Sequence, residues 1–317
     1  MEKLILNDKF RVKLTDQCNL ACPFCHAEGG KYAKDIVLNR EFFAAMELLR
    51  PHFTRVHLTG GEPMLYQKLD AILDVLQDFG YRVAVTTNGV FPLEKRLQMI
   101  KKLDYVNFSV HSLREPYMES LIQKGQKSKD IIATITQNIT EINKIVPVHI
   151  NTVVSEKSTL QGLEDLLEFA GAQHIEIKLV PEWRVRDIAE KDICEILEKN
   201  GFRLYEKIYL LPGSNVRERY QNQSGQIVEV KKIELFLPNF LCQDCKKKDD
   251  CREGFSFLRL GGNPLYFQPC IFKEKVSLKE FQETILPYIS GMLEEAAKKC
   301  DGFSGKQVLK VNGKEIS

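Results

Sequence analysis

The sequence has little that would direct the protein to a membrane or to nucleic acid. Its 45 basic and 43 acidic residues leave a formal net charge of +2, which provides no global attraction to nucleic acid or to an anionic membrane. No apolar run approaches the roughly 20 residues of a membrane span, and residues 1–8 are too short and too polar for a signal peptide. We therefore expect a cytoplasmic protein with neither kind of partner.

What the sequence does contain is a sizeable apolar fraction and an unusual number of thiols. Hydrophobic residues make up 44% of the 317 residues and charged residues 28%, a balance typical of a folded globular protein. There are nine cysteines. In a chain without an export signal, cysteines are expected to ligate metal rather than to form disulfides.

Three of these cysteines lie in one short segment, Cys18, Cys22 and Cys25, directly after the apolar run 10–14. The spacing C-x3-C-x2-C lets one loop present three thiolates to a common point, and thiolates suit an iron–sulfur cluster. A four-iron cluster held by three cysteines leaves one iron with an open position, where chemistry can occur as it does at an open catalytic zinc. A zinc knuckle and three ordinary buried thiols are the alternatives.

A second group of cysteines occurs near the carboxyl end: Cys242, Cys245, Cys251 and Cys270. The C-x2-C pair followed by two further cysteines indicates a metal site, which four thiolates could close around zinc or a second four-iron cluster. Cys194 and Cys300 stand apart, and each is expected to be a buried apolar thiol rather than a ligand or a hydrogen-atom donor.

Between residue 10 and residue 181 the sequence alternates short β-branched runs with amphipathic stretches. Such alternation predicts parallel βαβ units. Six in succession favour an α/β fold with a partial (β/α)6 TIM-type barrel, and a doubly wound open sheet is the alternative. The expected strands are residues 11–15, 55–59, 82–86, 105–110, 147–153 and 174–180, and the expected helices are residues 39–50, 67–79, 93–102, 128–144 and 160–170.

Each expected strand is followed by a distinctive polar or glycine-bearing segment. In a βα barrel these segments share one mouth, at the carboxyl ends of the strands, where chemistry is found. The segment after the second strand, residues 60–63, has paired glycines followed by a carboxylate. The glycines allow a ligand to approach the backbone closely, and the carboxylate can hold a cationic group. The candidate residues at this mouth are Gly60, Gly61, Glu62, Pro63, Thr87, Asn88, Ser109, Asn151 and Val180, with His26, His111 and His149 as candidate substrate or proton-transfer groups.

After residue 181 the alternation fades. A helix is expected at 186–199, strands at 203–211 and 226–237, a helix at 277–299, and an edge strand or loose tail at 306–317. We therefore predict two domains, a barrel over residues 8–185 and a smaller carboxyl-terminal domain over residues 186–317 that holds the second cysteine group.

The loop Cys18–Cys25, with Phe24 before its third cysteine, resembles the signature of the radical S-adenosylmethionine (SAM) superfamily. The resemblance implies an enzyme in which a [4Fe-4S] cluster on Cys18, Cys22 and Cys25 chelates SAM. One electron then splits the sulfonium and gives a 5′-deoxyadenosyl radical. It also implies contacts to SAM by Phe24, the 60–63 loop and the small polar residues at the other strand ends.

A narrower resemblance joins residues 8–185 to the GTP 3′,8-cyclase branch, which makes the first intermediate of molybdenum cofactor and carries an auxiliary cluster in its carboxyl-terminal domain. The motifs that carry it are 15–19, 24–29, 59–63, 106–113, 151–154 and 175–181.

The departures from this branch fall on the parts that recognise GTP. Gln17 and His149 stand where the branch has basic residues, and Lys246 begins a lysine run where the branch has Arg-x-Arg. Lysine and glutamine do not replace bidentate guanidinium groups. We therefore predict two [4Fe-4S] clusters and a substrate that is a non-GTP small molecule or a peptide, with GTP as the alternative. A low-potential electron donor such as flavodoxin or ferredoxin is the expected partner, and a non-enzymatic metal scaffold is the remote alternative.

Overall fold

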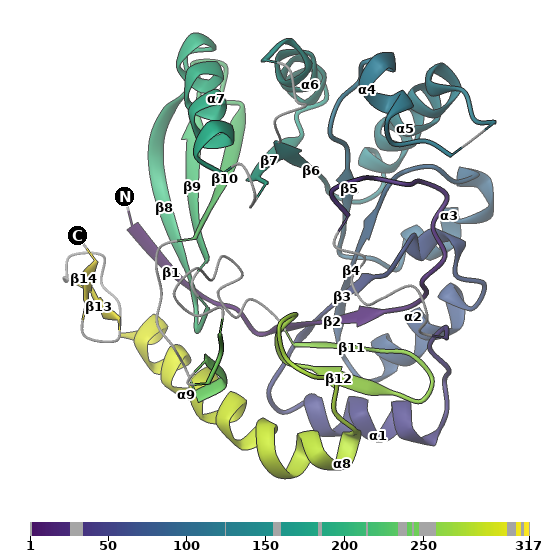
Figure 1. Ribbon diagram of the computed structural model, residues 1–317, viewed down its shortest axis with the longest axis vertical. Coiled ribbons are helices and arrows are strands. Elements are labelled where there is room, and N and C mark those ends of the chain that lie inside the picture. The colour runs from purple at the N-terminus through teal and green to yellow at the C-terminus, as the bar shows by residue number, and fades with distance from the viewer. Residues whose placement is uncertain are drawn as a thin grey trace.

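The computed structural model describes residues 2–25, 34–123, 125–154, 160–182, 186–213, 215–233, 240–242, 244–246, 258–302, 309–311 and 314–316. Its centre is a curled sheet of 12 strands (Figure 1). Six consecutive parallel strands form the middle of this sheet, in the order of the sequence, and confirm the predicted partial barrel rather than a doubly wound sheet. They are β2 (Lys9–Lys13), β3 (Arg55–Thr59), β4 (Arg82–Thr87), β5 (Tyr105–Ser109), β6 (Val148–Val154) and β7 (Glu176–Pro181).

Helices cover the convex face of these strands (Figure 1). The expected helix at 93–102 is divided at Arg96 into a 3₁₀ turn and one short α-helical turn. The helices are α1 (Arg40–Leu49), α2 (Leu69–Asp78), α3 (Leu97–Ile100), α4 (Glu115–Glu119), α5 (Ser128–Asn143) and α6 (Leu160–Ala172), with the 3₁₀ turns η1 (Pro63–Leu65) and η2 (Leu93–Lys95).

Helix α2 shows why these segments form and where they pack. Leu69, Ile72, Leu73 and Leu76 recur at three and four positions, so they form one apolar stripe, and each is at most 1% exposed. Burial of one such side chain stabilises the fold by about 1.5–3 kcal/mol relative to leaving it in water. The stripe packs on the outward-facing side chains of the sheet within one continuous core.

The carboxyl-terminal part of the chain extends the same sheet at both ends. On one side β10 pairs with β7 in parallel and continues through β9 and β8 to β1, and on the other β11 pairs with β2 and β12. The sheet thus runs across the predicted domain boundary at residue 185. The division of the chain into two domains stays a prediction. These elements are β1 (Glu2–Leu6), α7 (Arg186–Lys199), β8 (Arg203–Leu211), β9 (Asn215–Gln221), β10 (Ile227–Ile233), η3 (Phe240–Cys242), β11 (Arg259–Gly261) and β12 (Tyr266–Gln268).

The expected helix at 277–299 is three segments: α8 (Leu278–Glu280), the π-helical turn η4 (Phe281–Ile285) and α9 (Leu286–Asp301). Pro287 explains the interruption, because it has no N–H for an α-helical bond. The residue before it, Leu286, bonds its N–H to Phe281 O, five residues back. The tail forms a small hairpin of β13 (Leu309–Val311) and β14 (Lys314–Ile316). Among the helices that the structure describes, none is long and apolar enough to cross a membrane.

Candidate active site

The three-cysteine loop leaves the carboxyl end of β2. Cys18 and Cys22 are half-buried and Cys25 is exposed, and the Cys25 N–H donates to Cys22 O (3.1 Å) in a tight turn. Burial and, to a smaller extent, the charges of Cys25 and Cys18 raise the pKa of the Cys22 thiol to about 12.

The loop is held from outside by residues that sequence reasoning missed. The segment after α4 pairs with it, since the Ala21 N–H donates to Leu121 O (2.7 Å). The side-chain amide of Gln123 donates to Cys18 O (3.0 Å), and that of Gln126 donates to Asn19 O (3.2 Å). Because these partners are more than 100 residues from the loop in sequence, no local pattern could have indicated them.

The paired glycines lie directly against the cysteine loop. The Gly61 N–H donates to Thr15 O (2.7 Å) and the Glu62 N–H donates to Gln17 O (2.7 Å). A Cβ on Gly61 would lie 2.2 Å from Gln17 O, and Gly60 has φ +149°, which few other residues adopt. The structure thus adds a reason for the glycines: they admit the backbone that carries the cysteines.

Glu62 is fully buried and accepts hydrogen bonds from three groups. Its Oε1 accepts from Thr87 Oγ1 (2.7 Å) and from the Met64 N–H (2.9 Å), and its Oε2 accepts from the Asn88 N–H (2.6 Å). Burial raises the pKa of this carboxyl to about 7, and the three donors act in the opposite direction. Glu62 therefore ties the ends of β3 and β4 together at the mouth.

The side chain of Asn88 continues this connection to the cysteine loop. Its Nδ2 donates to Asn19 Oδ1 (2.8 Å) and lies 3.7 Å from Cys18 Sγ, while its Oδ1 accepts from the Val90 N–H (2.9 Å). The Leu20 N–H also donates to Cys18 Sγ (3.4 Å). Two N–H donors at one sulfur suit a thiolate ligand, which carries negative charge, so the donor set fits the implied cluster.

The remaining strand ends meet at the same edge of the sheet. Ser109 and Asn151 are register partners on β5 and β6, and Val180 pairs with Val153. The contacts with SAM stay predictions for every candidate residue: Phe24, Gly60, Gly61, Glu62, Pro63, Thr87, Asn88, Ser109, Asn151 and Val180.

His111 and His149 lie in different surroundings. The buried His111 ring packs perpendicular to the Phe24 ring, with 4.7 Å between the centroids, and its Nδ1 accepts from the Val153 N–H (3.1 Å). Burial lowers the pKa of His111 to about 4, so it is neutral at pH 7. His149 is half-buried, and its ring packs on Tyr105 with 5.2 Å between the centroids. Their substrate roles stay predictions, and His26 lies outside the described residues.

The concave face of the sheet is polar and rich in cations. Along β2, Phe10 and Val12 face the helices and are fully buried, while Lys9, Arg11 and Lys13 alternate with them on the concave face. Burial lowers the pKa of Lys9 well below its ordinary value, and the charges of Arg217, Lys178 and Arg11 lower it further. These cations therefore act on one another across the half-barrel.

On the opposite wall of the half-barrel, Glu229 is shared by two cations. Its Oε1 lies 3.2 Å from Lys178 Nζ and 3.3 Å from Arg217 Nε. Burial acts to raise the pKa of Glu229, but Lys178 and Arg217 hold it below its ordinary value. Burial lowers the pKa of Lys178 to about 8, and Arg217 contributes in the same direction.

The pKa of Lys178 predicts how stability changes with pH. Between about pH 8 and 10.5 the unfolded chain binds more protons at this residue than the folded chain, so Lys178 makes stability rise with pH. In urea titrations, the difference in unfolding free energy between wild type and Lys178→Met should change in favour of wild type by about 2 kcal/mol from pH 8 to pH 10. Parallel pH profiles would show that Lys178 keeps its ordinary pKa.

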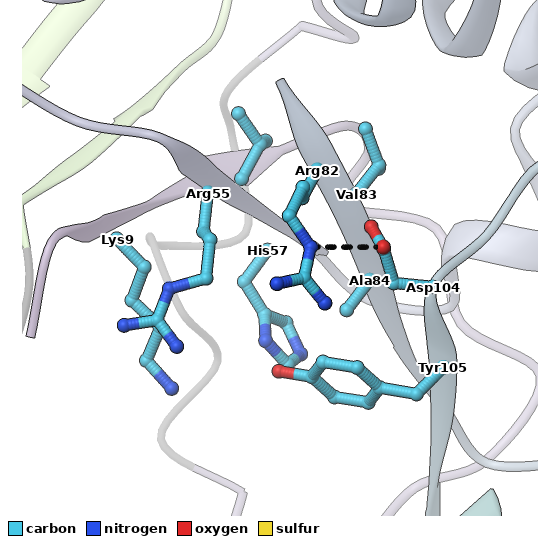
Figure 2. A pocket seen from close by; sticks show the side chains of 9 residues that line it. Lys9, Arg55, His57, Arg82, Val83, Ala84, Asp104 and Tyr105 are labelled. Carbon is cyan, nitrogen blue, oxygen red and sulfur yellow. Dashed lines mark hydrogen bonds and ion pairs between the residues drawn. The ribbon is translucent and has the colours of Figure 1, made fainter. Parts of the chain in front are cut away.

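A shallow pocket lies at the opposite, amino-terminal end of the strands. Figure 2 shows Lys9, Arg55 and Arg82 from neighbouring strands around His57 and Tyr105, with Arg82 paired to Asp104 (3.0 Å). It lies at the far edge of the sheet from the cysteine loop. We therefore centre the candidate active site on the mouth, with this pocket at the other end of the strands.

The second cysteine group is described in part. Cys242 ends η3, the Cys245 N–H donates to Cys242 O (3.1 Å), and Cys270 follows β12. Since β12 runs antiparallel to β11 and β2, Cys270 lies toward the amino-terminal end of the barrel strands. Cys251 lies outside the described residues. In the described stretches, no three His, Cys, Asp or Glu side chains are grouped to hold a single metal ion.

A curled α/β half-barrel with a three-cysteine loop at the carboxyl ends of its strands defines a class of cofactor-dependent enzymes. The model of the Radical SAM superfamily matches residues 12–170. The chain belongs to this superfamily and is an enzyme, and the family implies SAM and a [4Fe-4S] cluster.

Among curated relatives, GTP 3′,8-cyclase of Nautilia profundicola is 28% identical over 288 residues, which cover 86% of this chain and 84% of the relative. A probable GTP 3′,8-cyclase of Sulfolobus acidocaldarius is 28% identical over 250 residues, 76% of this chain and 77% of the relative. SuiB of Streptococcus suis, solved with its precursor peptide SuiA, superposes with a TM-score of 0.60 at 14% identity over 90% of this chain. The chain spans 65% of the length of SuiB, and this likeness concerns the fold.

Proposed function

We propose that Cys18, Cys22 and Cys25 hold the SAM-cleaving cluster, and that the substrate is a small molecule other than GTP, or a peptide. The observation that carries the proposal is the junction at the mouth of the barrel. There one buried carboxylate, Glu62, and one amide, Asn88, join the cysteine loop to the ends of β3 and β4. Such a junction keeps the loop in a fixed position, as a site for a reactive cofactor requires.

When bound, the cluster and SAM supply a 5′-deoxyadenosyl radical that removes a hydrogen atom from an unactivated carbon of the substrate. The chain's own task is to orient SAM and to exclude water from the radical. Phe24, which packs perpendicular to the His111 ring, would border SAM at the mouth. His111 is neutral and has its Nδ1 occupied, so its remaining ring N–H is a fixed donor.

The concave face offers charged groups of both signs to a polar substrate. Three acids there, Glu176, Glu206 and Glu229, are paired with Lys178, Arg217 and Arg219.

We propose that the second cysteine group holds an auxiliary [4Fe-4S] cluster that transfers electrons. Cys242, Cys245, Cys251 and Cys270 supply four thiolates, and Cys270 lies toward the amino-terminal end of the barrel strands. From Lys9 to Lys13, β2 is about 13 Å long, so a substrate on the concave face would lie between the two clusters. A low-potential donor such as flavodoxin or ferredoxin would supply the electrons.

GTP 3′,8-cyclase is the second candidate. Relatives with that name cover most of this chain. Against it stand Gln17, His149 and the lysines from Lys246 onward, which replace the basic groups expected of that branch. Lysine does not reproduce bidentate recognition by arginine.

An anaerobic assay separates the two candidates. The reconstituted enzyme is reduced with dithionite in the presence of SAM, with and without GTP, and 5′-deoxyadenosine and GTP-derived products are followed by mass spectrometry. The proposal predicts slow 5′-deoxyadenosine formation that GTP does not accelerate. Coupled formation of 5′-deoxyadenosine and a cyclised GTP product would establish the second candidate in its place.

A further inference from the structure

We propose that Asn88 is a positioning residue that donates a hydrogen bond to Cys18 Sγ and thereby raises the reduction potential of the cluster on this loop. The inference rests on the proposed function, since it takes Cys18 to be a cluster ligand. It concerns a role of Asn88 that is separate from any contact with SAM.

The orientation of the Asn88 amide is fixed by its neighbours. Asn19 Nδ2 donates to Val90 O (2.7 Å), so Asn19 Oδ1 must face Asn88 and accept from it. The Val90 N–H in turn requires an acceptor, which is Asn88 Oδ1. An amide nitrogen carries two N–H groups. One is used on Asn19, and the other is directed at Cys18 Sγ, 3.7 Å away.

The backbone of Asn88 is held as firmly as its side chain. Its N–H donates to the buried Glu62 Oε2 (2.6 Å), and the hydroxyl of Thr87 donates to Oε1 of the same carboxylate (2.7 Å). The Gly89 N–H donates back to Thr87 Oγ1 (3.0 Å). A donor fixed at both its backbone and its amide stays directed at the sulfur in both oxidation states.

The consequence for reduction follows from charge. When the cluster takes up one electron from an external low-potential donor, its negative charge increases and the ligand sulfurs become stronger acceptors. Hydrogen bonds to those sulfurs therefore favour the reduced form, and they are among the features that set the potential of such clusters. Loss of the Asn88 donor should make the cluster harder to reduce.

The test compares two variants of Asn88 with a matched control. Asn88→Ala removes the donor, and Asn88→Asp keeps the shape and the acceptor for the Val90 N–H but replaces the donor by a negative oxygen. Asn138→Ala is the control, because Asn138 holds the same turn through Gly89 O and Phe91 O (2.9 Å each) without contacting Cys18. Iron and sulfide contents establish that each protein carries its cluster, and EPR-monitored redox titration without SAM gives the potential.

At the wild-type midpoint potential, the ratio of reduced to oxidised cluster should fall about fivefold in Asn88→Ala, the change that loss of one hydrogen bond produces. It should fall further in Asn88→Asp and stay within about twofold of wild type in Asn138→Ala, which retains the bond. An unchanged ratio in both Asn88 variants, or an equal fall in Asn138→Ala, would overturn the inference while wild type still cleaves SAM. A wild-type protein that binds no cluster would instead refute the proposed function.

Discussion

Cys22→Ala is expected to reduce 5′-deoxyadenosine formation to the level of a control without enzyme. Cys22 is the middle ligand of the three-cysteine loop and packs against the hydrophobic core. Alanine at this position leaves the loop with only two thiolates. A four-iron cluster on the two remaining thiolates would lack a second ligand as well as the one left open for SAM. The measurements are iron content, the visible absorption of the cluster and 5′-deoxyadenosine yield after dithionite reduction.

Cys194→Ala is the matched control for this experiment. Cys194 lies on α7 and is exposed, so its removal should leave iron content and 5′-deoxyadenosine yield unchanged. Normal SAM cleavage by Cys22→Ala, with full iron at the first site, would contradict the assignment of the ligands.

Gly61→Ala is expected to destabilise the protein severely and to prevent cluster assembly. The added Cβ would lie 2.2 Å from Gln17 O and 2.7 Å from Asp16 O, both backbone atoms of the cysteine loop. Overpacking against side chains costs about 1–3 kcal/mol, because side chains can shift to make room. Here the clashing atoms belong to the backbone that carries the cluster ligands, so the cost should be higher. We expect the free energy of unfolding, measured by urea titration, to fall by more than about 3 kcal/mol, and we expect the protein to lose its iron.

Gly291→Ala controls for the glycine itself. Gly291 lies in α9 with open space around the position of a Cβ, so alanine there should stabilise the helix by about 0.5–1 kcal/mol. A Gly61→Ala protein as stable and as iron-rich as wild type would show that the cysteine loop does not need this close approach.

Elements with strong local periodicity could be predicted from the sequence. The strands at 55–59 and 203–211 and the helix at 186–199 coincide with β3, β8 and α7, because each is defined by its own apolar pattern. β1, β9, β11 and β12 were missed. β11 and β12 have three residues each. β11 depends on pairing with β2 and β12 on pairing with β11, and no local pattern indicates either pairing.

The candidate site divides in the same way. The motifs around Cys18, Gly60 and Asn88 could be located from the sequence, because glycine, cysteine and asparagine are distinctive at strand ends. The partners of these motifs could not, since Gln123 and Gln126 reach the cysteine loop only through the fold. The effect of Lys178 and Arg217 on the pKa of Lys9 could not be predicted either, because the three residues lie on different strands of the concave face.

The most direct test of the central claim is electron–nuclear double resonance on the reduced enzyme with SAM labelled at its amino nitrogen. If the cluster on Cys18, Cys22 and Cys25 binds SAM at its open iron, the label will give a hyperfine coupling to the cluster signal, and Cys22→Ala will abolish it. A wild-type enzyme with its cluster intact, saturated with SAM, that shows no such coupling would contradict the account.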